Sequence, residues 1–385
     1  MSARKGGRVR GAGLPCALLL GLVVTLTLAA AAVAVLAAST SPEARGASSR
    51  TPDELAAPGP YIPPLSPDPF KPGVAVSSGE DESDPYLLVA DGRYFLYTSG
   101  VPGLLNVPVA TSTDFESWSP VQDALPALPA WATPGYTWAP DVHRFGSTWE
   151  LYFTAMLRGW SPPTECIGSA SGTSPLGPFV ARATPLICQL GLGGSIDPRV
   201  FTDSSGAHWM LWKSEQNIGG ASTPTMLWSQ PLSADGLTLT GRPSLLMEPD
   251  EGWQGTIVEA PQMVEVDGAY WVFYSGNWFN QPAYAIGAAR CAGPSGPCAD
   301  TSTLPLLGSN AQGLGPGEES VFEDASGLWL LYSPWHSLAP KPDFPPRPVF
   351  IARIGLLPTG PYLAAWEPPP SLGLLDSETV WSGTP

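Results

Sequence analysis

The sequence predicts an all-β protein built as a five-bladed β-propeller, preceded by an N-terminal signal or anchor segment and a Pro/Ser-rich linker. Three observations lead to this prediction. The chain holds 42 Gly and 46 Pro among 385 residues, which disfavours long helices. A hairpin-like pattern recurs five times at a period near 60 residues, as expected of a propeller with one blade per repeat. The hydrophobic fraction of 43% is enough to build a large core.

The N-terminal segment has the pattern of an export signal. Four basic residues stand ahead of an uncharged apolar run at residues 14–38. The run fits either a cleaved signal sequence or a membrane anchor, and both place the remainder of the chain outside the cytoplasm. We assign residues 1–39 to this segment. Residues 40–74, rich in Ser, Pro, Ala and Glu, are assigned to a disordered linker.

The repeats occupy residues 86–100, 142–155, 199–214, 262–276 and 320–335. Each copy has a short apolar strand, a turn with Gly and a second strand dense in aromatic residues, which is the signature of a β-hairpin. Unrelated hairpins of a β-sandwich are the alternative, and the regular period argues against it. We expect the propeller to span residues 75–365, with residues 349–360 pairing with the start of the first blade to close the ring. Residues 366–385 form a C-terminal tail.

Charge and cysteine content narrow the partners and the compartment. The formal net charge is −16, which disfavours binding to nucleic acid. Cysteines at 166 and 188, and at 291 and 298, allow three pairings. The simplest is two local disulfides, Cys166–Cys188 and Cys291–Cys298, in an oxidising compartment.

An acidic residue stands near the start of every repeat. The acids are Asp84, Asp141, Asp197, Glu259 and the pair Glu318 and Glu319. Because equivalent positions of a propeller converge at one end of the central channel, we expect several carboxylates around one funnel. Clustered carboxylates raise one another's pKa, so one can act as a general acid beside a general base, as glycoside hydrolysis requires. Calcium binding or turn capping is the alternative for any single acid.

These motifs resemble those of glycoside hydrolase family 43, which includes arabinanases, arabinofuranosidases and β-xylosidases. The resemblance covers about residues 78–360. It implies that Asp84 in S-D-P is the general base and that Glu259 in E-A-P is the general acid. It implies that Asp197 in I-D-P-R-V-F tunes the pKa of the acid and orients the substrate.

Several further residues are candidates for binding the substrate. Trp138 begins the family's W-A-P-D element, which ends at Asp141, and the Trp is expected to shape the sugar pocket. Asn277 and Trp278 follow the fourth hairpin, and Arg290 stands in an Ala-Arg context that often reaches the site in this family.

Glu318 lies where many family members have a His that helps to hold a central metal. We therefore assign no metal ligand and expect no required cofactor, and an axial calcium would need carboxylate ligands.

The sequence predicts a secreted or surface-anchored hydrolase that cleaves arabinofuranosides, or xylosides, by an inverting acid–base mechanism. Its partner would be an oligo- or polysaccharide, and membrane contact would be limited to the N-terminal segment of a monomer. One alternative is a non-catalytic sugar-binding propeller, which would be expected to lose one of the three acids. Another is a related five-bladed glycosidase or phosphorylase acting on a different glycan. Fructan-hydrolase signatures are absent, and the 18 Lys and Arg residues are few for a phosphate pocket.

Overall fold

The computed structural model describes residues 70–71, 82–115, 117–217, 223–310, 313–324, 327–335 and 347–364. All of them belong to the second of two compact units, Pro58–Pro385. The predicted N-terminal segment 1–39, the tail 366–385 and most of the linker 40–74 lie outside the described residues. Within the described ranges, no helix is long and apolar enough to cross a bilayer.

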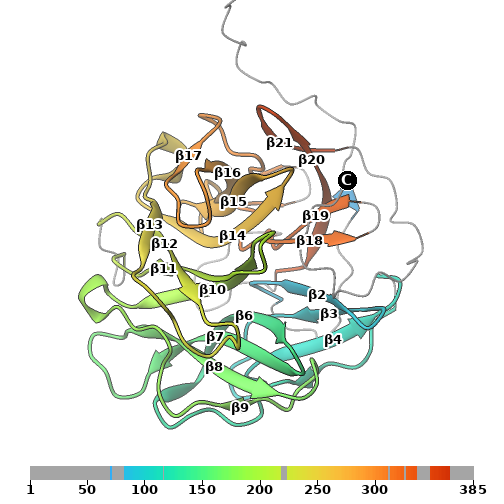
Figure 1. Cartoon of the computed structure of the whole chain (residues 1–385), viewed down its shortest axis with the longest axis vertical. Helices are drawn as coiled ribbons and strands as arrows, with labels where there is room; N and C mark the ends of the chain where they lie inside the picture. Colours follow the sequence, from blue (N-terminus) through green and yellow to red (C-terminus); the bar gives the residue numbers. More distant parts are fainter. Residues whose placement is uncertain are drawn as a thin grey trace, which may run out of the picture. The chain divides into compact units, whose positions relative to one another are not determined.

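Five antiparallel sheets surround a common centre, with the first strand of each repeated hairpin innermost (Figure 1). This arrangement confirms the predicted five-bladed β-propeller. Blade one consists of β2 (Tyr86–Ala90), β3 (Arg93–Tyr97), β4 (Pro108–Ser112) and β5 (Gln122–Asp123). Blade two consists of β6 (Ala132–Phe145), β7 (Thr148–Leu157), β8 (Glu165–Gly172) and β9 (Val180–Ala181). Blade three consists of β10 (Ser195–Thr202), β11 (His208–Ser214), β12 (Met226–Leu232) and β13 (Ser244–Met247).

Blade four consists of β14 (Val258–Val266), β15 (Ala269–Gly276), β16 (Ala285–Cys291) and β17 (Cys298–Asp300). Blade five consists of β18 (Ser320–Asp324), β19 (Gly327–Tyr332), β20 (Phe350–Leu357), β21 (Gly360–Leu363) and the short β1 (Phe70–Lys71). The described chain contains no α-helix, and its named helical turns are η2 (Leu190–Leu192) and η4 (Gly252–Gln254).

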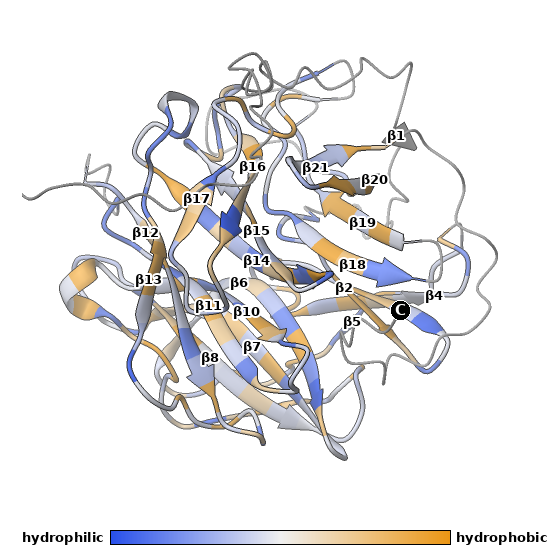
Figure 2. Ribbon diagram, turned by 45° about the horizontal axis from the view of Figure 1, so that its top comes forward, coloured by the Kyte–Doolittle hydropathy of each residue, from blue (hydrophilic) through white to orange (hydrophobic). Residues whose placement is uncertain are grey.

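The predicted hairpins form because their turn residues accept left-handed backbone. Asp91 and Gly92 have φ of 49° and 70°, and Asp267 and Gly268 have φ of 51° and 71°. Two successive residues with positive φ make the type I′ turn that matches the twist of paired strands. Along the strands, hydrophobic stretches recur among more polar ones (Figure 2), and the aromatic second strands are almost fully buried.

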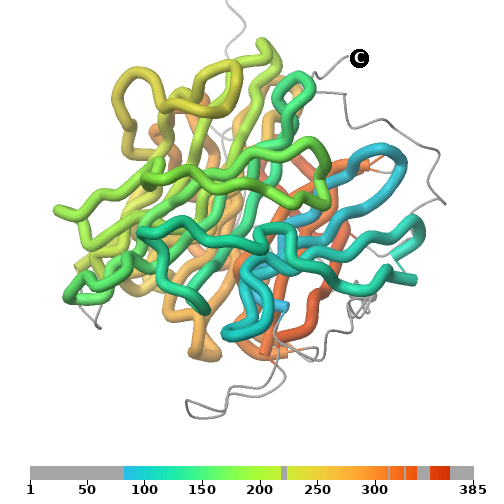
Figure 3. The backbone as a smooth tube through the Cα atoms, turned by 90° about the horizontal axis from the view of Figure 1, so that it is seen from below, coloured from blue at the N-terminus to red at the C-terminus, as the bar shows by residue number. Residues whose placement is uncertain are grey.

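The ring closes through side-chain packing between blade five and blade one. One hydrophobic cluster lies at each of the five blade interfaces, and the cluster that joins blade five to blade one contains Leu87, Phe115, Phe322 and Ile351. The first and last blades lie side by side in the view of Figure 3.

The pairing differs from the one expected for residues 349–360. The strand β20 is the third strand of blade five and pairs with β19 on one side. On its other side it pairs with β21 and with β1, in which Phe70 faces Ala352. The first blade therefore contributes no strand to this sheet. Instead, two residues from the region predicted to be linker cover an edge that would otherwise be open.

Both predicted disulfides are present. Cys166 pairs with Cys188, and Cys291 pairs with Cys298 across the last two strands of blade four.

Candidate active site

A backbone irregularity near the start of each inner strand positions the acids. The register shifts between Trp138 and Asp141 in β6, between Ile196 and Arg199 in β10, and between Glu259 and Gln262 in β14. At each bulge one residue has a positive φ, and blades one and five have such a residue at the equivalent place. These residues are Asp84, Ala139, Asp197, Ala260 and Glu318, with φ between 47° and 57°. Bulges re-aim side chains, and a left-handed non-Gly residue costs about 1–3 kcal/mol.

The sequence suggested that the acids occupy one repeated position, and the structure shows that they do not. Asp84, Asp197 and Glu318 lie at the left-handed position, Glu259 lies one residue before it, and Asp141 lies two residues after it. The inner strands also begin earlier than expected in blades two to four, because hydrogen bonding continues through the bulge. Asp141, Asp197 and Glu259 are thus inside their strands.

Asp84 is held by two polar contacts at the start of blade one. The Ser99 hydroxyl donates to its Oδ2, and Nη2 of the buried Arg347 lies 3.4 Å from its Oδ1. A guanidinium beside a carboxylate favours the ionised form. Ser99 also accepts the Ala139 backbone N–H at 3.1 Å, so Asp84 is fixed relative to blade two.

Asp197 and Glu259 form an interacting pair on adjacent blades. Oδ2 of Asp197 accepts the backbone N–H of Ala260, the residue after Glu259, at 3.0 Å. Both side chains are largely buried, at 6% exposure each. Burial, followed by the nearby charge of Glu259, raises the pKa of Asp197 to about 7, and Asp84 adds to the effect. A buried carboxyl pair of this kind can hold a proton near neutral pH.

Glu259 contacts one cation and one phenol. The buried ammonium of Lys213 donates to Oε2 at 2.7 Å, and the buried hydroxyl of Tyr284 lies 2.6 Å from Oε1. Lys213 also donates to Oε1 of Glu215 at 2.6 Å. The sequence-based expectation considered only the repulsion among carboxylates, whereas the structure adds an ammonium that contacts Glu259 directly.

The hydroxyl of Tyr284 links Glu259 to Glu318. It lies 2.7 Å from Oε1 of Glu318, and a phenol has only one proton to donate. One of the two carboxyl groups must therefore be protonated for both contacts to be hydrogen bonds. Burial and the charges of Asp84, Glu259 and Asp197 raise the pKa of Glu318 well above its ordinary value, so the proton belongs on Glu318. Gly317 makes room for this contact, since a Cβ there would overlap the Tyr284 ring.

Asp141 joins blades two and three below the bulge. Its Oδ2 accepts the Val200 N–H at 2.9 Å, and burial raises its pKa to about 6 although Arg199 opposes the rise. Tyr86 and Gln262, at equivalent positions, also bond to the backbone of the following blade. Residues at this position therefore connect neighbouring blades by hydrogen bonds. The structure does not bring Asp141 into the hydrogen-bond network of Glu259. Its predicted contact with substrate stays a prediction.

The axis carries an internal cation. The Arg199 guanidinium donates to the Pro140 carbonyl at 2.6 Å and lies over the Tyr86 ring at 5.1 Å. It also interacts with Glu319, a fully buried residue whose pKa burial raises to about 8. The Arg199 guanidinium places a positive charge among these carboxyls, which opposes the binding of an axial calcium. Among the described residues, no group of three or more His, Cys, Asp or Glu side chains is arranged to hold a metal ion.

Trp138 lies at the bulge position that Glu259 occupies in blade four, so the two side chains leave their strands in the same sense. Its ring contacts Tyr136 edge-to-face at 6.4 Å between centroids. Both residues lie on an N-terminal extension of β6. This strand begins seven residues before Ala139, whereas β10 and β14 begin two residues before their left-handed residues. Tyr136 is 45% exposed.

Asn277 and Trp278 follow β15 directly. The Asn277 amide donates to the Trp253 carbonyl and accepts the Trp278 N–H, both at 2.9 Å. Asn277 thus shapes a turn with φ of 78°, and the turn presents the half-buried Trp278. Their contact with substrate stays a prediction.

Arg290 is placed away from the carboxylates, which corrects the expectation that it reaches the site. In the register of blade four, Glu259 pairs with Ser275. Ser275 in turn pairs with Ile286, whereas Arg290 pairs with Trp271 toward the other end of the sheet. Its side chain is exposed and its guanidinium lies 5.3 Å from the Trp271 ring centre. A strand fixes direction and distance, and Arg290 lies four residues beyond Ile286 along β16.

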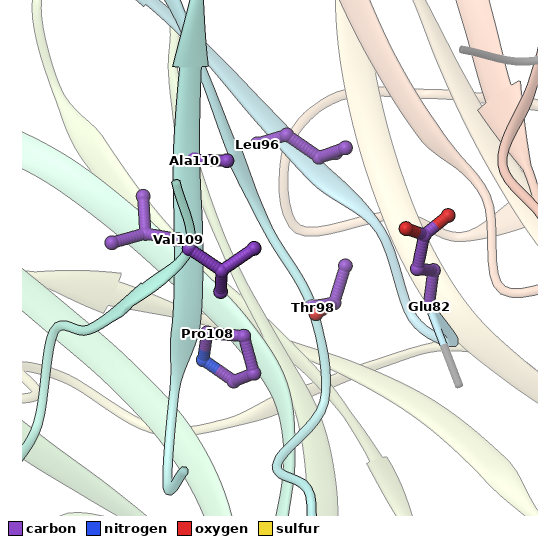
Figure 4. Close-up of a pocket in the computed structure, with 7 residues that line it drawn as sticks. Glu82, Leu96, Thr98, Pro108, Val109 and Ala110 are labelled. Carbon is purple, nitrogen blue, oxygen red and sulfur yellow. The ribbon is translucent and has the colours of Figure 1, made fainter. Parts of the chain in front are cut away.

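A small hollow opens at blade one beside the start of the described chain. Leu96, Pro108, Val109, Ala110, Val121, Thr98 and Glu82 line it. Figure 4 shows Glu82 across the hollow from Pro108 and Val109. The carboxylates described above do not line it, so the hollow is not the candidate active site.

A general acid and a general base, both carboxyl groups, are the equipment of a glycoside hydrolase. The family model for glycosyl hydrolases family 43 matches residues 76–356. The chain belongs to this family and is a glycosyl hydrolase.

Individual relatives are distant. The chain is 27% identical over 210 residues to a β-D-galactofuranosidase of Aspergillus niger, a match that covers 52% of this chain and 57% of the relative. It is 26% identical over 263 residues to an extracellular exo-α-(1→5)-L-arabinofuranosidase of Streptomyces chartreusis, covering 63% and 76%. The crystal structure of a thermostable family-43 glycoside hydrolase has 28% identity and a TM-score of 0.64, covering 75% and 94%.

Proposed function

We propose that the chain is an extracytoplasmic glycosidase that cleaves arabinofuranosides with inversion of configuration. The observation that carries the proposal is the coupling of Asp84, Asp197 and Glu259, which three different blades bring to one end of the propeller. Burial, followed by the charges of these three residues, raises the pKa of Glu318 as well. Such a group can hold one proton for donation beside an ionised carboxylate that accepts one.

Glu259 donates a proton to the leaving oxygen, and Asp84 removes a proton from the attacking water. Asp84 suits the base because Arg347 and Ser99 stabilise its ionised form. Asp197 fixes the backbone beside Glu259 through the Ala260 N–H, so it holds the acid in place. Inversion needs no covalent intermediate, because the water attacks opposite the leaving group.

A five-membered sugar ring is the shared feature of the substrates named for the relatives. One relative is named a galactofuranosidase and another an arabinofuranosidase. The exposed Tyr136 and the adjoining Trp138 add aromatic surface beside the acids, which suits stacking against sugar rings. We therefore favour an arabinofuranosyl oligo- or polysaccharide, with galactofuranosides and xylosides next.

Two observations bear on location and extent. Cys166–Cys188 and Cys291–Cys298 are disulfides, which supports folding in an oxidising compartment outside the cytoplasm. The family match at residues 76–356 supports a propeller domain that spans about residues 75–365.

A substrate panel tests the proposal. Aryl α-L-arabinofuranoside, β-D-galactofuranoside and β-D-xylopyranoside would be compared by kcat/KM, and arabinan oligosaccharides would follow. We expect the arabinofuranoside to be the best substrate and NMR to show the inverted anomer as the first product. Retention of configuration would overturn the mechanism, and preference for another sugar would overturn only the substrate.

A further inference from the structure

One position in every blade, on the second strand or one to two residues beyond its end, faces the residue before the bulge. Four blades place a hydroxyl there and blade three places an ammonium. The five residues are Ser99, Thr154, Lys213, Ser275 and Ser333.

The hydroxyls do one repeated structural job. Each of three accepts the backbone N–H of the left-handed residue on the next blade. Ser99 accepts from Ala139 at 3.1 Å, Thr154 accepts from Asp197 at 3.1 Å, and Ser275 accepts from Glu318 at 3.0 Å. Ser333 instead donates to the Glu82 carbonyl of blade one at 3.0 Å. A small hydroxyl residue is therefore the side chain that the scaffold itself requires at this position.

Lys213 breaks this pattern between blades three and four. An ammonium cannot accept a hydrogen bond, and the Ala260 N–H is accepted by the Asp197 carboxylate instead. Burying the ammonium is unfavourable unless carboxylates compensate it, and Lys213 is only 1% exposed. The replacement therefore has no advantage for blade packing, and its position against Glu259 and Glu215 points to a role in the reaction.

We propose that Lys213 is a positioning residue that sets the pH range in which Glu259 carries its proton and fixes the direction of its carboxyl group. The inference rests on the proposed role of Glu259 as general acid. By stabilising ionised Glu259, Lys213 makes it a stronger proton donor and moves the basic limb of the pH–rate profile downward.

The other charged groups at this place are accounted for. Lys213 faces Glu215, Glu259, Asp197 and Glu165, and Glu259 faces Lys213, Tyr284, Asp197, Glu318 and Glu319. Lys213 is the cation of this set. The other members are carboxyl groups, apart from Tyr284, which is a neutral phenol. Removing the ammonium leaves the neighbouring carboxyls and burial, which favour a protonated Glu259, opposed only by the hydrogen bond from Tyr284.

The decisive variant is Lys213→Ser, which restores the residue type that three other blades use. Because the scaffold accepts Ser at this position, the variant should fold. The expected result is a basic limb of kcat/KM that moves upward by about one to three pH units, the effect of losing one close opposite charge. Lys213→Arg keeps the charge and should leave the limb within about half a unit. A limb unchanged in Lys213→Ser would overturn the proposal.

Two further measurements separate this role from a structural one. Ser333→Ala removes the equivalent side chain of blade five, and it should lower the melting temperature without moving the basic limb of the pH–rate profile.

The second measurement needs no activity, so it remains informative if the proposed reaction is wrong. Without Lys213, the buried carboxyls prefer to be protonated, so the melting temperature of Lys213→Ser relative to wild type should rise from pH 8 to pH 5. Parallel curves would contradict the proposal.

Discussion

The bridge from Glu318 through Tyr284 to Glu259 makes a prediction about charge. If Glu318 is a neutral acid that donates to Tyr284, then Glu318→Gln should preserve both the charge and a donor. We expect kcat/KM within about threefold of wild type and an unchanged pH–rate profile between pH 5 and 8. Glu318→Asp would retract the carboxyl group by one methylene from the 2.7 Å contact, and we expect it to be worse than Gln.

Tyr284→Phe should behave in the opposite way. It removes the hydroxyl that contacts Glu259 at 2.6 Å while keeping the buried ring. A hydrogen bond to a charged group contributes about 1.5–3 kcal/mol. Losing it from the acid should therefore lower kcat/KM by about 10- to 150-fold.

The assay is kcat/KM across pH for both variants on one aryl glycoside, with thermal unfolding as the control for folding. A Glu318→Gln variant that loses more than about tenfold, or whose limbs shift, would show that Glu318 is ionised in the resting enzyme. The proton count at Tyr284 would then be wrong. An unaffected Tyr284→Phe variant would show that the phenol does not position the acid.

Three other outcomes follow from the structure. Glu259→Ala should lose about 100-fold or more of its activity on a natural linkage but under about tenfold on an activated aryl glycoside. Asp84→Ala should lose most of its activity on both substrates, because the water must be activated whatever group leaves. Equal losses of activity for Glu259→Ala on both substrates would reject Glu259 as the acid. Tyr136→Ala should raise KM for oligosaccharides but not for aryl monosaccharides, and Leu245→Ala, a similarly exposed side chain on blade three, should change neither. Burial and His208 lower the pKa of His143 from 6.5 to about 4. The contribution of neutral His143 to stability is therefore complete above pH 6.5 and declines as pH falls toward 4. By pH 5 the free energy of unfolding should fall by up to about 2 kcal/mol, and His143→Gln should remove that pH dependence in urea titrations.

The fold was predictable because its signals are local and repeated. A D-G turn between apolar strands needs no distant information, and five copies at a near-constant period require a closed arrangement. The pairing of β20 with Phe70 and Lys71 was not predictable, because two residues in a Pro-rich segment carry no strand pattern.

The candidate site was predictable only for residues within the repeats. Asp84, Asp197 and Glu259 stand beside bulges that recur, so their convergence follows from topology. Tyr284 and Arg347 lie in connections between repeats, where the sequence carries no equivalent to compare. Arg290 was misplaced because a short motif was used where strand register decides the position.

Lys213 was missed although a signal for it exists. Aligned by their aromatic residues, the second strands end in Y-T-S, F-T, W-K, Y-S and Y-S. A propeller presents nearly the same backbone to each of these residues, so a side chain that differs from its counterparts cannot be explained by the local backbone. The residue before the bulge shows the same kind of exception. Ser83, Ile196 and Gly317 are uncharged at this position, whereas Glu259 carries a carboxyl group. In a fold built from repeats, the positions that break a shared structural pattern at a buried charge are therefore the strongest candidates for chemistry, and Lys213 and Glu259 are two such positions 2.7 Å apart.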